Sequence, residues 1–79
     1  MSILSLEDVL HEYRTLATQA TELRTTLKSI RDQLAHGGRT ADWVHRAKRA
    51  YDFKAQQLRQ VKEELRAYRA VLRSKDMID

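Results

Sequence analysis

The sequence predicts an all-α protein in which two long helices pair as an antiparallel coiled-coil hairpin. Apolar residues recur in alternating steps of three and four through both halves of the 79-residue chain. The only two glycines, Gly37 and Gly38, adjoin each other between these halves, and the chain contains no proline. Two helices joined by so short a connection have to fold back on each other, so the glycines mark the turn.

The first helix is predicted over residues 5–36. Ser5 suits the N-cap, because its hydroxyl can accept a hydrogen bond from the Asp8 amide. Gly37 suits the left-handed position that ends many helices. Between these ends the heptad a and d positions form one apolar stripe: Leu6, Val9, Tyr13, Leu16, Ala20, Leu23, Leu27, Ile30 and Leu34.

The second helix is predicted over residues 40–75, after a turn at residues 37–39. Thr40 or Asp42 can cap its start. Its stripe continues the same spacing: Val44, Ala47, Tyr51, Lys54, Leu58, Val61, Leu65, Tyr68 and Leu72. Lys54 is the one charged residue in either stripe. The whole chain, residues 1–79, is thus interpreted as a single helical-hairpin domain.

Two registers of the hairpin compete, because the numbers of facing residues in an antiparallel pair have a constant sum. A sum of 74 sets Lys54 opposite the small Ala20, and a sum of 81 sets it opposite Leu27. We expect the sum of 74, since a lysine stem needs space to pass its neighbour and reach solvent.

Composition and motifs argue against catalysis and against membrane insertion. The chain has no cysteine, no long apolar run and no basic signal-peptide start, so a cytoplasmic protein is expected. Glu7 and His11 share a helical face, but no third metal ligand joins them. No serine has a neighbouring base, and no glycine loop could hold phosphate. We expect no enzyme activity, no catalytic residues, no metal, no cofactor and no small-molecule substrate.

Positive charge is concentrated in the second helix, although the net charge of the whole chain is only +4. Five cations recur there at steps of three and four and form what we call the basic ridge: Arg59, Lys62, Arg66, Arg69 and Arg73. The ridge is either a solvated, solubilising surface or a docking strip for an acidic protein or a phosphate backbone. The sequence favours neither interpretation over the other.

Two aromatic residues lie outside the stripes. Phe53, on the side of the second helix away from the stripe and near Arg46 and Arg49, is either a partner contact or an idle exposed ring. Trp43 either covers the turn against Leu34 or anchors a partner.

A lone hairpin buries little apolar surface relative to the conformational entropy lost on ordering its chain, so we expect it to associate. Homodimerisation into a four-helix bundle is the first hypothesis, and binding to another protein is the alternative. The apolar stripe widens near the termini, which predicts a dimer interface composed of Leu6, Leu10, Ala17, Val71 and Leu72.

Three functions remain compatible with these patterns. The first is a small protein-binding regulator or inhibitor, for which a phage or mobile-element origin is one hypothesis. The second is a hairpin that binds nucleic acid by contacting phosphates through its second helix. The third is a purely structural oligomerisation module. We expect the first, with an acidic protein surface as partner, and rank membrane binding last because the apolar stripe is narrow and already matched.

Overall fold

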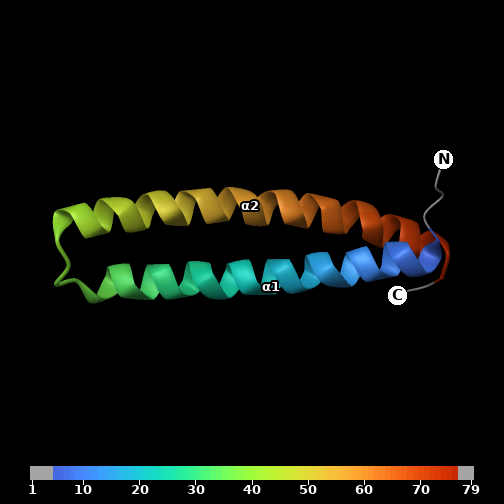
Figure 1. Cartoon of the computed structure of the whole chain (residues 1–79), viewed down its shortest axis with the longest axis horizontal. Helices are drawn as coiled ribbons and strands as arrows, with labels where there is room; N and C mark the ends of the chain where they lie inside the picture. Colours follow the sequence, from blue (N-terminus) through green and yellow to red (C-terminus); the bar gives the residue numbers. More distant parts are fainter. Residues whose placement is uncertain (1–4, 77–79) are drawn as a thin grey trace.

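The computed structural model describes residues 5–76, which form two antiparallel helices joined by a short loop (Figure 1). Helix α1 spans Leu6–His36 and helix α2 spans Ala41–Ser74. These bounds confirm the predicted helices, and the predicted helical-hairpin fold is confirmed with them. The helices lie side by side along their length, giving a rod with extents of 52 × 28 × 14 Å. Residues 1–4 and 77–79 of the predicted domain lie outside the described residues.

The start of α1 is held by reciprocal hydrogen bonds between Ser5 and Asp8. The Ser5 hydroxyl accepts from the Asp8 amide at 3.1 Å, and the Asp8 carboxylate accepts from the Ser5 amide at 3.3 Å. Each bond satisfies a backbone donor that has no partner inside the helix. The predicted N-cap is therefore confirmed, and its second bond adds a constraint that the sequence analysis did not include.

The loop between the helices needs glycine for its backbone. Gly37 has φ 70° and Gly38 has φ 72°, in the half of the Ramachandran map that residues with a side chain avoid. The ψ of Gly37 is −166°, which lies outside the left-handed helical region that we predicted for it. This extended combination at positive φ is essentially restricted to glycine. The turn thus depends on glycine even more strongly than a left-handed cap would.

The start of α2 is capped by Thr40, which resolves the choice between Thr40 and Asp42. The Thr40 hydroxyl accepts a hydrogen bond from the Trp43 amide at 3.1 Å. Asp42 lies in the first turn instead, where its carboxylate pairs with Arg46 at 3.1 Å. A negative charge there is favoured by the positive end of the helix dipole.

The core runs along the two predicted stripes. Every residue of both stripes is buried or half-buried except Leu6. The central cluster consists of Leu16, Ala20, Leu58 and Leu65, against which further stripe residues pack. The heptad interpretation of both halves is therefore confirmed.

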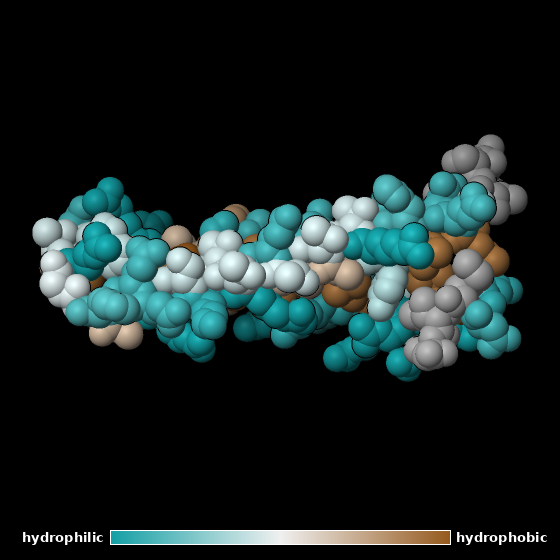
Figure 2. Space-filling view, turned by 90° about the horizontal axis from the view of Figure 1, so that it is seen from below, coloured by the Kyte–Doolittle hydropathy of each residue, from teal (hydrophilic) through white to brown (hydrophobic). Residues whose placement is uncertain are grey.

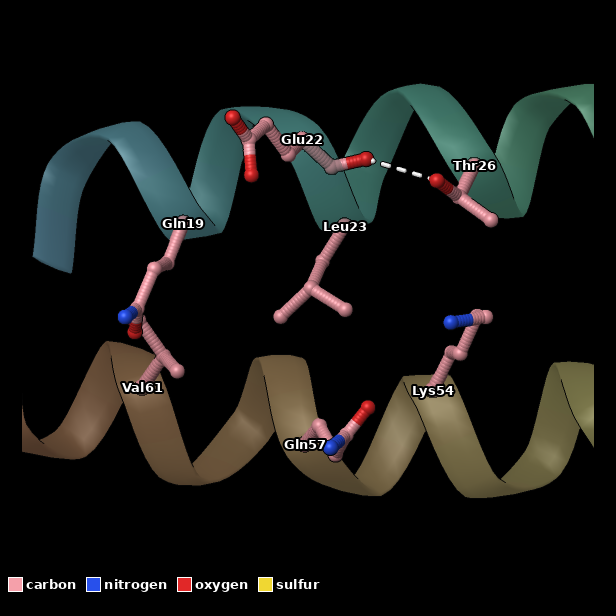
Figure 3. A pocket seen from close by; sticks show the side chains of 7 residues that line it. All are labelled: Gln19, Glu22, Leu23, Thr26, Lys54, Gln57 and Val61. Carbon is pink, nitrogen blue, oxygen red and sulfur yellow. Dashed lines mark hydrogen bonds between the residues drawn. The ribbon is translucent and has the colours of Figure 1, made fainter.

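The register is close to a sum of 81, so the expected sum of 74 is wrong. Figure 3 shows Val61 opposite Gln19 and Lys54 level with Thr26, which gives sums near 80. The burial of Leu72, near the termini, also supports a register near 81. Leu72 is fully buried, as expected if it lies level with Val9, whereas a sum of 74 would leave it beyond the start of α1.

Lys54 explains why the expected register failed. Its side chain is half-buried and points across the seam into a hollow of about 370 Å³ between the helices (Figure 3). Polar groups dominate the lining of this hollow, which consists of Gln19, Glu22, Leu23, Thr26, Lys54, Gln57 and Val61. The lysine therefore needs a polar exit at the edge of the seam, and a small residue directly opposite is not required.

Candidate docking site

The basic ridge lies on the outside of α2, and all five of its side chains are exposed. Lys62 and Arg69 occupy heptad e positions beside the seam, whereas Arg59 and Arg66 occupy b positions further out. Within residues 5–76, none of these four cations has an ion-pair partner. The Arg46–Asp42 ion pair lies at the other end of α2, near the turn. The ridge is exposed, as predicted.

Helix α1 contributes to the same surface. Arg24 lies beside Lys62, Arg66 and Arg69 around a hollow of about 220 Å³, with Leu65 in its lining. Leu65 is a buried core residue, so it forms the floor while the four cations form the rim. The positive potential of the ridge therefore extends across the groove onto α1.

A second hollow, of about 300 Å³, lies nearer the turn. Arg31 of α1 and Lys48 of α2 line it together with Leu34, Tyr51 and Asp52. Arg31 and Lys48 occupy e positions, and so do Arg24 and Lys62 near the first hollow; the e positions of both helices lie along the same edge of an antiparallel seam. Both hollows therefore open on the same side of the hairpin, and we call the groove that contains them the basic groove.

The side of the hairpin formed by the b and e positions of both helices is termed the basic side. It carries ten of the 15 Lys and Arg residues, all exposed: Arg14, Arg24, Lys28, Arg31, Lys48, Arg59, Lys62, Arg66, Arg69 and Arg73. Glu7 and Asp52 are the two acidic residues at these positions. Five of these cations form the predicted ridge, and the other five were not assigned to a site from the sequence. Their signal was present in the heptad positions, because e positions meet across an antiparallel seam.

The opposite side, formed by the c and g positions, has the reverse charge and is termed the polar side. Among the described residues it carries Asp8, Glu12, Glu22 and Glu64, with Arg46 as the one cation at these positions. The two sides of one thin rod therefore differ strongly in electrostatic potential.

Phe53 lies on the polar side and is 63% exposed. Of the two arginines predicted to accompany it, Arg46 is paired with Asp42 on its own helix and Arg49 is exposed. The Phe53 group and the basic ridge therefore belong to different sides of α2. A single partner helix seated on one of them would not contact the other.

The predicted dimer interface is only partly available at the surface. Leu6 and Val71 are 41% and 46% exposed, and Leu10 and Ala17 are half-buried. Leu72 is fully buried in the single chain, so its assignment to an exposed interface is wrong: it packs inside the hairpin instead. Figure 2 shows hydrophobic side chains gathered at the end of the rod opposite the turn.

Trp43 lies at the turn end and is half-buried. The guanidinium of Arg39 is stacked over its ring, 4.6 Å from the centroid. This cation–π contact joins the loop to the first turn of α2. Trp43 thus contacts the loop through Arg39, and its packing against Leu34 stays a prediction.

No group of three or more His, Asp or Glu side chains that could hold a metal ion occurs within residues 5–76. Neither described helix contains an 18-residue stretch apolar enough to cross a bilayer. Comparison of the chain with protein-family models, curated proteins and solved structures finds no match.

Proposed function

We propose that this hairpin is a non-enzymatic regulator or inhibitor that binds an acidic surface of another protein through its basic side. The concentration of ten cations on that side carries the proposal. Charges dispersed over the whole surface would keep the protein equally soluble. A mixture of positive and negative charges would do so with less repulsion between neighbouring side chains. Keeping so many like charges together favours a partner of opposite charge.

The apolar floor of the basic groove favours a protein partner over nucleic acid. Leu65 lies beneath the cations of one hollow, and Leu34 and Tyr51 line the other. A phosphate backbone is bound by charge and hydrogen bonds and gains little from apolar side chains. A protein surface can bury apolar groups against this floor while its carboxylates meet the rim. Binding to phosphates remains the second candidate, because the ridge forms a continuous line of charge along α2.

A pair of double charge reversals tests the proposal. Arg66→Glu with Arg69→Glu reverses the centre of the ridge, and Arg46→Glu with Arg49→Glu makes the same net change on α2 away from the basic side. All four side chains are exposed, so both variants should keep the circular dichroism of the parent hairpin. We expect acidic proteins to be captured from a cell lysate by the parent and the control, and to be lost with the ridge variant.

Two outcomes would contradict this function. Equal capture by both variants would identify the basic side as a solvated surface. Capture of nucleic acid, with an affinity that falls linearly in a log–log plot against salt, would establish phosphate binding instead. Each variant needs the same protein concentration, because self-association would otherwise alter the number of available sites.

A further inference from the structure

We infer that the partner element seated in the basic groove is an acidic amphipathic α-helix of about four turns, lying lengthwise between α1 and α2. This inference rests on the proposed function and specifies the shape of the partner surface. A third helix placed over the seam would form a three-helix layer, in which its apolar stripe meets the groove floor and its carboxylates meet the cations of the rim.

The spacing of the two hollows sets the length of the bound helix. The hollow near the turn is lined on α2 by residues 48–52, and the other is lined by residues 62–69. Their centres are about 15 residues apart, or ~23 Å at 1.5 Å per residue. A straight helix of about 16 residues, or four turns, therefore reaches both hollows.

Small side chains along the groove allow a helix to approach closely: Ala55 lies between the two hollows, and Ala17 lies level with Lys62 at the second hollow. Ala17 of α1 and Ala55 of α2 both occupy e positions, and both are half-buried. Ala17 packs against the core cluster, so it belongs to the floor of the groove. Alanines at these positions leave space above the floor, where a longer side chain would obstruct a docked helix.

The rim has the periodicity of a helix partner. From Arg59 to Arg73, cations on α2 recur every three or four residues, as carboxylates do along one flank of an amphipathic helix. Nearer the turn, Asp52 and Ala55 follow Lys48 at the same heptad positions. Arg24 and Arg31 of α1 supply cations on the other rim, so both flanks of the docked helix meet positive charge. An extended peptide or a phosphate backbone would use the charges without covering Leu65 in one hollow and Leu34 and Tyr51 in the other.

Two synthetic 18-residue peptides provide the direct test. The first has a Leu/Ala stripe at i, i+3, i+4 and i+7 flanked by glutamates, and the second has the same composition in an order that disperses the stripe. We expect the patterned peptide to bind the full chain at least tenfold more tightly than the scrambled one. Its helical circular dichroism should increase on binding, and the Arg66→Glu, Arg69→Glu variant should bind neither peptide.

An uncharged substitution in the floor of the basic groove separates the effect of groove shape on peptide binding from the effect of charge. Ala55→Gln places a longer side chain in the groove, while Ala70→Gln makes the same change at an exposed position of α2. We expect Ala55→Gln to reduce binding of the patterned peptide at least fivefold and Ala70→Gln to leave it unchanged. Circular dichroism of both variants establishes that the hairpin remains folded.

The outcomes distinguish this inference from the function on which it rests. Equal affinity for both peptides, with both lost on charge reversal, would overturn the helix-in-groove inference and leave acidic-partner binding intact. If neither peptide binds while acidic proteins are still captured in a charge-dependent manner, the helix-in-groove inference is likewise overturned and acidic-partner binding is retained. A 20-base-pair DNA duplex that binds more tightly than either peptide at equal salt would overturn the inference and the proposed function together.

Discussion

Leu72 and Val71 are adjacent in the chain, yet Leu72 is fully buried and Val71 is 46% exposed. Substituting each of them by alanine therefore tests the seam between α1 and α2 and its register. Leu72→Ala should lower the free energy of unfolding by about 2–5 kcal/mol, because it removes apolar contacts and leaves a cavity. Val71→Ala should lower it by less than about 1 kcal/mol. Denaturant titration followed by circular dichroism measures both values, and equal losses would contradict the register near 81.

Replacing both turn glycines should change the number of chains in the assembly. Gly37→Ala with Gly38→Ala imposes a steric cost at two positive φ angles, about 1–2 kcal/mol each, and it favours helix through the loop. Two chains would then pair as long helices in a swapped dimer. Light scattering should show this increase in mass. Ala35→Gln is the control, since it changes an exposed residue next to the loop without affecting either glycine, and an unchanged mass in the double variant would contradict the prediction.

Lys54 should destabilise the seam relative to an apolar side chain of equal length. Lys54→Met retains most of the stem beside Leu23 and removes the ammonium group from a half-buried side chain, so we expect the free energy of unfolding to rise by about 1 kcal/mol. Lys48→Met is the matched control, because Lys48 is exposed. Thermal unfolding at one protein concentration compares them. A loss of stability in Lys54→Met would mean that the ammonium group makes a favourable interaction in the polar hollow.

Self-association is expected at the open end of the hairpin, through the exposed apolar side chains Leu6 and Val71 together with Leu10. Leu10→Glu should weaken a homodimer, because association would then bury a carboxylate in an apolar interface. Thr25→Glu introduces the same charge at an exposed position of α1 and should have no such effect. Light scattering from micromolar solutions gives the mass. A folded monomer in the parent protein would rule out the homodimer.

The helices and the turn were predictable because local signals agree there with the global fold. Ser5 and Thr40 are favourable caps, the glycines allow positive φ, and the three-and-four spacing defines one stripe on each helix. These signals depend on residues close together in the sequence. The helix bounds follow from them to within one residue.

The register depends on contacts between distant residues, and the sequence pattern alone does not determine it. Both sums set apolar residues opposite apolar residues along most of the seam, so they differ mainly at the ends and at Lys54. The deciding observations are the burial of Leu72 and the polar hollow around Lys54. The place of Arg24 and Arg31 on the basic side does not depend on the register, because their heptad e positions meet the e positions of α2 across any antiparallel seam.

The opposite charges of the basic side and the polar side give the rod an electric dipole across its short axis. A negatively charged partner therefore exerts a torque on the freely tumbling hairpin and turns the cations toward itself before the surfaces touch. Such pre-orientation raises the association rate constant above the value for neutral surfaces, which is about 10⁵–10⁶ M⁻¹s⁻¹. The gain disappears as added salt shortens the Debye length. For the acidic partner that we propose, charge placement along the two edges would thus determine how quickly it is found as well as how tightly it is held.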